Sequence, residues 1–161
     1  NAFINKTKAN ISKCSISPDM IAGFPTETEQ DHQDTLKLMD YVKYSFGYMY
    51  SYSERPGTLA GRKMEDDVPE ETKARRLQEI VDLQQAHARY RTEQYIGQTV
   101  EVLVEKVCKK SPNEFSGRNS QSITVVFPKE NYKIGDFVNV LVERTTGATL
   151  IGKAIGLSEM N

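Results

Sequence analysis

The chain has 161 residues, of which 38% are hydrophobic and 27% are charged, and its formal net charge is -1. This composition indicates a soluble globular chain of about one or two domains, and it excludes a protein that binds nucleic acid or an anionic membrane through its overall charge. No apolar run approaches the roughly 18 residues of a membrane span and no signal peptide opens the sequence, so we expect no membrane partner.

The two cysteines, Cys14 and Cys108, lie far apart and have no metal-ligand spacing. Such sparse, unpaired cysteines are typical of a reducing compartment. We therefore expect a cytoplasmic protein without a disulfide framework, and neither cysteine by itself indicates a metal site.

The first strong pattern lies in residues 19–31. Residues 3–14, which precede it, are polar with scattered apolar side chains and indicate a helix or an irregular segment. The run Met20-Ile21-Ala22 is typical of a buried strand, and Gly23-Phe24-Pro25 predicts a turn after it.

The turn leads into a predicted helix. Thr26 and Thr28 are each followed three residues later by an acidic residue, as in helix N-caps. A strand that feeds a helix is half of a β-α-β unit, and ligands bind at the C-terminal ends of parallel strands. We interpret this junction as the rim of a small-molecule site.

A helix over residues 28–44 and a second strand over residues 46–52 follow. Apolar residues recur at helical spacings of three, three and four: Leu36, Met39, Val42 and Phe46. Aromatic residues then alternate with small ones, which predicts a strand parallel to the first. We expect its tyrosines to pack in the core, with ligand stacking as the alternative, and Tyr52 at the strand end is the exception.

Arg55 follows this second strand in a turn set by Pro56-Gly57. An arginine at a strand end suits a bidentate grip on a carboxylate or phosphate. The alternative is an ordinary surface salt bridge, for example to Glu54.

The longest predicted helix covers residues 68–97, about 27 of them helical, with Pro69 near its start and Gly97 as its stop signal. Its arginines alternate with acids: Arg75, Arg76, Arg89 and Arg91. We expect a docking and connecting helix with solvated charges rather than a nucleic-acid-binding helix.

Residues 98–158 show five short runs of strand character, separated by turn residues. This pattern predicts a small antiparallel barrel of about 60 residues, like the oligonucleotide/oligosaccharide-binding fold. Lys109, Lys110, Phe115 and Arg118 supply the cations and the aromatic ring with which such barrels bind single-stranded nucleic acid. A solvated basic loop explains the same charges equally well.

Several motifs in the right order resemble the C-terminal half of the radical S-adenosylmethionine methylthiotransferases. They are residues 19–31, residues 52–60, and residues 66–71 followed by Lys73, Arg76, Leu77, Leu83 and Gln84. The terminal barrel resembles the TRAM domain of that family, through Gly117-Arg118-Asn119 and Val125-Val126-Phe127.

The resemblance implies a fold and a domain order. We expect an α/β part followed by an all-β part: residues 3–67 as the end of a partial (β/α) barrel with parallel strands, residues 68–97 as a connecting helix, and residues 98–158 as a five-stranded antiparallel TRAM barrel.

The resemblance also implies an activity and its cofactors. Within the family, the best match is to the branch that methylthiolates isopentenyladenosine beside the tRNA anticodon, with S-adenosylmethionine and two 4Fe-4S clusters. One cluster is bound by a CxxxCxxC motif, and neither that motif nor the second set of three cysteines is present here. We therefore expect a fragment that is inactive by itself, whose TRAM part binds the anticodon stem-loop.

Site residues are implied position by position. Ile21, Gly23 and Glu27 match the strand-end motif beside the adenosyl group, with Ile21 contacting adenine, Gly23 allowing close approach and Glu27 bracing the turn. Arg55 and Thr58 match the loop that faces the substrate cavity. The residues expected to contact tRNA are Lys109, Lys110, Phe115, Arg118 and Asn119.

Two alternatives stay open. One is the sister enzyme that methylthiolates an aspartate of a ribosomal protein, and the other is a stand-alone RNA-binding module. Exposed strand edges of a partial barrel further predict that copies of the chain associate.

Overall fold

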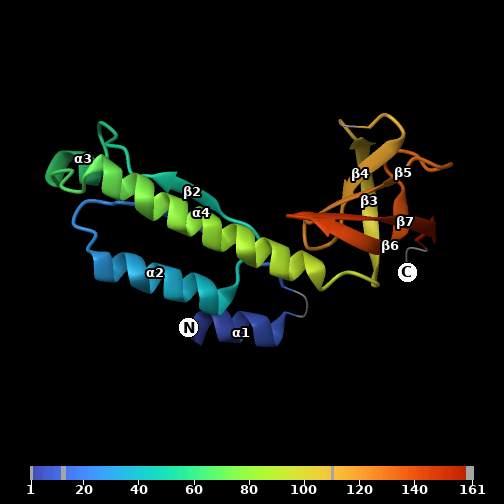
Figure 1. Cartoon of the computed structure of the whole chain (residues 1–161), viewed down its shortest axis with the longest axis horizontal. Helices are drawn as coiled ribbons and strands as arrows, with labels where there is room; N and C mark the ends of the chain where they lie inside the picture. The colour runs from blue at the N-terminus through green and yellow to red at the C-terminus, as the bar shows by residue number, and fades with distance from the viewer. Residues whose placement is uncertain (1, 12–13, 110, 159–161) are drawn as a thin grey trace. The chain divides into compact units, whose positions relative to one another are not determined.

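The computed structural model describes residues 2–11, 14–109 and 111–158, and these form helices in the first half and a β-barrel in the second (Figure 1). In chain order the elements are α1 (Ala2–Asn10), β1 (Asp19–Ala22), α2 (Glu29–Val42), β2 (Tyr48–Ser51), α3 (Leu59–Lys63), α4 (Glu70–Glu93), β3 (Thr99–Val107), β4 (Glu114–Arg118), β5 (Thr124–Pro128), β6 (Phe137–Thr146) and β7 (Thr149–Leu157). None of the helices in the described residues is long and apolar enough to cross a bilayer.

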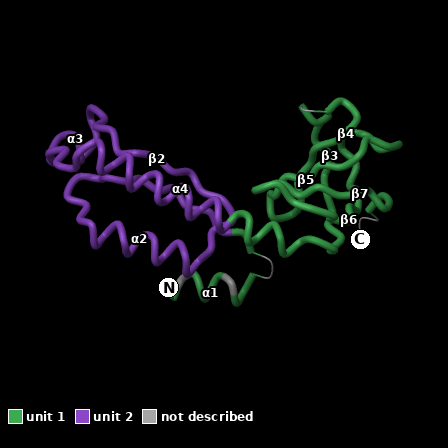
Figure 2. The backbone as a smooth tube through the Cα atoms, viewed as in Figure 1, with its two compact units in different colours: residues 1–15, 88–161 green, residues 16–87 purple. Residues whose placement is uncertain are grey.

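The chain divides into two compact units, coloured separately in Figure 2. The unit of residues 16–87, drawn in purple in Figure 2, is called the first unit, and the unit of residues 1–15 and 88–161, drawn in green, is called the second unit. Helix α4 contributes to both units. The boundaries at 67/68 and 97/98 that the sequence indicates remain predictions.

In the first unit, β1 and β2 form a parallel pair whose register runs from Asp19 opposite Tyr48 to Ala22 opposite Ser51. The prediction of a strand, a helix and a parallel strand is therefore confirmed. One face of this pair is covered, since Ala22 is buried, whereas Ile21, Tyr48 and Tyr50 on the other face are each more than half exposed.

Helix α2 begins where the hydroxyl pattern indicates, and of the two threonines only Thr28 is its N-cap. The Thr28 side chain accepts a hydrogen bond from the Asp31 amide, and the Asp31 carboxylate accepts one from the Thr28 amide, which is a capping box. Thr26 instead has a left-handed backbone with φ 72°, and its amide donates to Asp67 at 2.7 Å.

Helix α4 has 24 residues, and Gly97 lies in the turn after it with φ +80°. Its buried face in the first unit is mostly polar: Lys73, Arg76, Ile80, Gln84 and His87. The expectation that its arginines are solvated is wrong for Arg76, which is 4% exposed because it pairs with acids at the start of α2.

The second unit contains a closed barrel with strand order β3-β4-β5-β7-β6. Inward side chains of every strand build its core, including Val102, Phe127, Val138 and Leu150. The barrel has the predicted five strands, but it is mixed rather than antiparallel, because β5 pairs in parallel with β7. The sheet closes on itself through two pairings of strands that are not consecutive in the chain, β5 with β7 in parallel and β3 with β6 in antiparallel.

Candidate functional site

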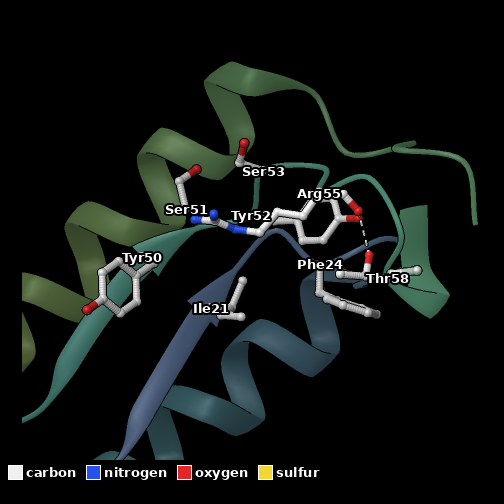
Figure 3. Close-up of a pocket in the computed structure, with 9 residues that line it drawn as sticks. Ile21, Phe24, Tyr50, Ser51, Tyr52, Ser53, Arg55 and Thr58 are labelled. Atoms are coloured by element: carbon white, nitrogen blue, oxygen red, sulfur yellow. Dashed lines mark hydrogen bonds between the residues drawn. The ribbon is translucent and has the colours of Figure 1, made fainter. Parts of the chain in front are cut away.

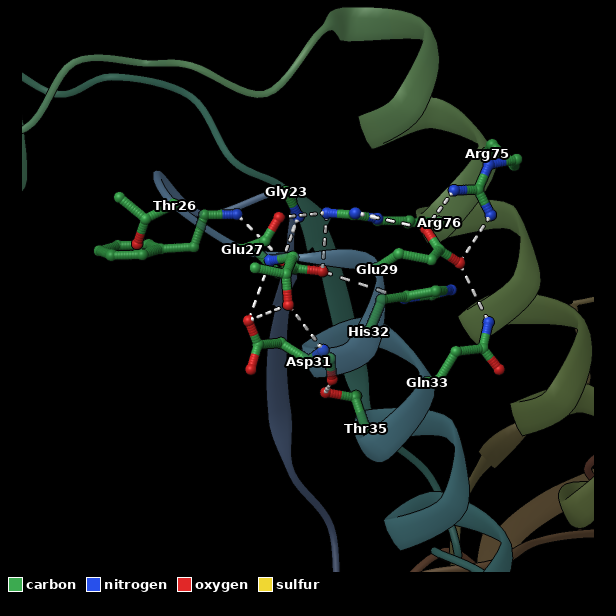
Figure 4. A network of polar contacts seen from close by, with 12 residues as sticks. Gly23, Thr26, Glu27, Glu29, Asp31, His32, Gln33, Thr35, Arg75 and Arg76 are labelled. Atoms are coloured by element: carbon green, nitrogen blue, oxygen red, sulfur yellow. Dashed lines mark hydrogen bonds and ion pairs between the residues drawn. The ribbon is translucent and has the colours of Figure 1, made fainter.

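The turn after β1 is held by the carboxylate of Glu27, which lies just before the N-cap of α2. Glu27 Oε2 accepts hydrogen bonds from the amides of Gly23 at 2.6 Å and Phe24 at 3.1 Å, as Figure 4 shows. Glu27 is mostly buried, with 14% of its side chain exposed, so these charge-assisted bonds face little competition from water. Glu27 thus holds the backbone of the turn, and its place beside an adenosyl group stays a prediction.

Gly23 leaves no room for a side chain. Its φ of +73° lies in the left-handed region, and a Cβ atom there would stand 2.3 Å from Cγ of Lys73. The group that approaches Gly23 closely is thus the aliphatic stem of Lys73 on α4. Its amide is also occupied by Glu27 and does not offer a donor to a ligand.

Two further residues of α4 and α2 complete this network. Arg76 donates to the Glu27 carbonyl at 2.9 Å and forms ion pairs with Glu27 and Glu29, each at 3.3 Å. His32 is fully buried, and its Nε2 lies 2.7 Å from Glu79.

The hydrogen bonds that Arg75 and Lys73 form with neighbouring carboxylates shift pKa values in this network. The hydrogen bond from Arg75 lowers the pKa of Glu29 from 4.5 to about 2. Hydrogen bonds to Asp66 and Glu70 raise the pKa of Lys73, so this ammonium group stays charged and acts as a fixed cation, not as a base.

A pocket of about 480 Å³ opens at the ends of the two strands (Figure 3). It is lined by Ile21, Phe24, Tyr50, Ser51, Tyr52, Ser53, Arg55, Thr58 and Ala60. The structure therefore brings together three of the residues expected there: Ile21, Arg55 and Thr58. Gly23 and Glu27 do not line it, and instead they shape the turn beside it.

Aromatic rings form much of the pocket wall. Phe24 packs edge-on against Tyr52 at a centroid distance of 5.2 Å. Tyr52, the expected exception to core packing, is 8% exposed and lines the pocket, whereas the core packing expected of Tyr48 and Tyr50 is wrong. Those two rings lie on the uncovered face of the sheet, because alternate residues of a strand point to opposite faces.

Arg55 is exposed, and within the described residues its guanidinium group makes no hydrogen bond or ion pair. The surface salt bridge considered for it, to Glu54, is not formed in this part of the chain. Thr58 caps α3 by accepting from the Gly61 amide at 3.1 Å and donates to the Arg55 carbonyl at 2.8 Å. Thr58 thus fixes the loop that carries Arg55.

Sequence reasoning missed Phe24, Lys73 and Arg76 as parts of this site. The spacing of Lys73, Arg76 and Ile80 by three and four residues places them on one helical face, which was the available signal. The charges of Lys73 and Arg76 obscured this signal, because charged residues are rarely buried unless they are paired.

On the barrel, the residues expected to contact RNA have different environments. Lys109 is exposed, and Arg118 is exposed with a 3.7 Å contact to Glu105. Phe115 is 2% exposed and packs against Phe127, so its role as a surface platform for stacking is wrong. Lys110 lies outside the described residues.

Asn119 is buried and organises the turn between β4 and β5. Its Oδ1 accepts hydrogen bonds from the amides of Gln121 at 3.1 Å and Ile123 at 2.9 Å, while its Nδ2 has no hydrogen-bond partner in the described residues. Lys129 lies over the Phe115 ring, 5.4 Å from its centroid, and its amide bonds to Asn113. Lys129, which directly follows β5, thus lies beside the loop that carries Lys109.

No group of three or more His, Cys, Asp or Glu side chains that could hold a metal ion occurs in residues 2–11, 14–109 and 111–158. Cys14 and Cys108 are free thiols. An iron-sulfur cluster of the expected kind needs three cysteine ligands, and the chain's two cysteines cannot supply them.

Comparison with known proteins identifies both halves. Residues 93–155 match the TRAM domain. Over 99% of its length the chain is 76% identical to the tRNA-2-methylthio-N(6)-dimethylallyladenosine synthase of Flavobacterium johnsoniae and 64% identical to that of Christiangramia forsetii. The protein of the same name from Parabacteroides distasonis is 44% identical over 90% of the chain. The chain spans about a third of the length of these relatives.

Proposed function

We propose that the chain belongs to the family of the tRNA-2-methylthio-N(6)-dimethylallyladenosine synthases. We further propose that it serves the methylthiolation of isopentenyladenosine beside the tRNA anticodon. The observation that carries this proposal is the 76% identity over 99% of the chain. A tRNA substrate fits a cytoplasmic location.

The pocket at the strand ends is the proposed ligand site of the first unit. S-adenosylmethionine would supply the radical chemistry of such an enzyme, together with two 4Fe-4S clusters that the two cysteines of this chain do not fit. Ile21 would lie beside the adenosyl group, and Gly23 and Glu27 would set the turn next to it.

Arg55 is the proposed anion-binding group of the same pocket. Its guanidinium group is unpaired within the described residues, and Arg55 lines the same pocket as the aromatic residues Phe24, Tyr50 and Tyr52. A planar guanidinium group beside aromatic rings suits a carboxylate or phosphate attached to an aromatic base. Thr58 would keep Arg55 in place through the loop hydrogen bonds.

The TRAM barrel is the proposed tRNA-binding part. Lys109 and Arg118 are exposed on it and, with Lys110, would contact phosphates, while Asn119 would shape the neighbouring turn. Lys129 extends this set because it lies beside the Lys109 loop. The relatives described above are named for a tRNA reaction, which favours tRNA over the ribosomal-protein aspartate.

Binding of an anticodon stem-loop RNA to the chain tests this part. We expect micromolar or weaker binding that falls as salt rises, because each neutralised phosphate releases counterions. The variant Lys109→Gln should bind more weakly and reduce the slope of log affinity against log salt by about one. Lys153→Gln, on β7 outside this set, serves as the matched control. Absent or salt-insensitive binding would contradict the tRNA role of the barrel.

The chain by itself is proposed to be inactive, because it cannot hold the clusters that start the reaction. After reconstitution with iron and sulfide, incubation with S-adenosylmethionine and dithionite should yield no 5'-deoxyadenosine above background. Production of that nucleoside would refute this part of the proposal.

A further inference from the structure

Helix α4 presents two buried cations, Lys73 and Arg76, to the strand-end turn that borders the pocket. We propose that these side chains are positioning residues, which hold the turn after β1 and thereby set the shape of the pocket wall. The consequence for ligand binding rests on the function proposed above, whereas the geometry of the turn does not.

Arg76 fixes the orientation of the Glu27 carboxylate. Its Nη1 lies 3.3 Å from Oε1 of Glu27, while Oε2 of the same carboxylate accepts the amides of Gly23 and Phe24. Each oxygen therefore has its own partners, and the group cannot rotate without losing one set. Arg76 also bonds to the Glu27 carbonyl, which ties the backbone of the turn to the helix.

Lys73 supports the turn from its other side. The stem of Lys73 fills the space that a side chain at Gly23 would occupy, and its ammonium group bonds to Asp66 at 2.6 Å and Glu70 at 2.8 Å. The same ammonium group lies 5.5 Å from the centroid of the Tyr52 ring, which lines the pocket.

Two residues that these contacts hold, Phe24 and Tyr52, line the pocket themselves. Phe24 lines it, and its amide is held by the carboxylate that Arg76 orients. Tyr52 lines it, and its ring faces the Lys73 ammonium group. Loss of the Arg76 cation would leave a mostly buried carboxylate without its ion-pair partner, which favours a rearranged turn.

Arg75 is a natural control for Arg76. The two arginines are neighbours on α4, and both reach the Glu29 carboxylate, at 2.6 Å and 3.3 Å. The side chain of Arg75 is 47% exposed and pairs otherwise with Glu79, whereas the side chain of Arg76 is 5% exposed and pairs with Glu27. Replacement of either one by Met removes a charge from the same helix turn, but only Arg76→Met acts on the strand-end turn.

Amide hydrogen exchange measured by NMR tests the positioning role directly. In Arg76→Met we expect the amides of Gly23 and Phe24 to exchange about tenfold faster or more, the size expected when charge-assisted hydrogen bonds weaken. The Tyr52 amide, bonded to the Ala22 carbonyl within the strand pair, should keep its protection. Arg75→Met should leave all three amides as in the wild type, and Arg76→Lys should restore part of the protection.

Binding of adenosine monophosphate, used as a probe, tests the consequence for the pocket. We expect Arg76→Met to weaken this binding at least about fivefold, Arg76→Lys to recover part of it and Arg75→Met to leave it unchanged. If the wild-type chain does not bind the probe, the ligand assignment of the pocket fails, while the exchange measurement still decides the role of Arg76.

Unchanged exchange at Gly23 and Phe24 in Arg76→Met, or equal acceleration in Arg75→Met, would overturn the inference. If Arg76→Met does not fold, Arg76→Lys decides instead, because a lysine cannot contact the Glu27 carbonyl, Glu27 and Glu29 together as the guanidinium group does. Faster exchange confined to the two turn amides is then expected, and wild-type exchange rates would count against the positioning role.

Discussion

At the scale of single residues, Gly23 carries the heaviest local constraint in the site. It combines a left-handed backbone with contact against the Lys73 stem, and its amide bonds to Glu27. Gly57 shares the first property without the second, since its φ is +86° and nothing lies within 4 Å of the position of a Cβ atom. A comparison of Gly23 with Gly57 therefore separates the cost of backbone strain from the cost of steric crowding.

We predict that Gly23→Ala lowers the free energy of unfolding by about 2–4 kcal/mol, because left-handed strain adds to the displacement of Lys73. Gly57→Ala should cost about 1 kcal/mol, from strain alone. Urea unfolding of both variants at equal m-values measures the difference. Equal losses in the two variants would show that the Lys73 contact contributes nothing.

At the scale of elements, the capping box joins the strand-end turn to α2. The hydrogen bonds from the Thr28 hydroxyl and amide lower the pKa of Asp31 in the folded chain. A carboxyl group with a depressed folded-state pKa contributes stability above its unfolded-state pKa, and this contribution is lost as the pH falls through the folded-state value. The cap is therefore a pH-dependent part of the helix.

We predict that Asp31→Asn flattens the acid side of the stability profile, so that the variant loses less stability than the wild type between about pH 6 and pH 2. Thr28→Ala should lower the free energy of unfolding at neutral pH by about 1 kcal/mol. Asp82→Asn on α4, which caps no helix, is the control. Urea unfolding across this pH range checks both, and a profile of Asp31→Asn parallel to the wild type would refute the role of the cap.

At the scale of the whole molecule, the uncovered face of the β1–β2 pair is the most exposed apolar surface formed by strands of the first unit. Ile21, Tyr48 and Tyr50 lie on it with 54%, 59% and 55% of their surfaces exposed. Within the described residues the pair has no third strand, so both of its edges lack backbone partners. Exposed edges and apolar faces of this kind promote association.

We predict that copies of the chain associate through this face in a concentration-dependent way. The double variant Tyr48→Lys, Tyr50→Lys should shift the equilibrium toward the monomer, because like charges would then meet across the interface. Light scattering over micromolar concentrations measures it, with Tyr90→Lys on α4 as the control. A wild-type monomer throughout that range would contradict the prediction.

The sequence by itself determined β1, α2, β2, the long helix α4 and the five barrel strands, together with the parallel pairing of β1 with β2, because periodicity, turn residues and caps act over a few neighbouring positions. It also indicated that Ile21, Arg55 and Thr58 lie close together, since the ends of parallel strands meet at one edge. Only the tertiary structure decided that Phe115 is core, that Tyr48 and Tyr50 are exposed, that β5 pairs with β7, and that Lys73 and Arg76 are buried. Burial of a charge depends on partners distant in sequence, here Asp66, Glu27 and Glu29, and no local pattern specifies which partners the folded chain will bring together.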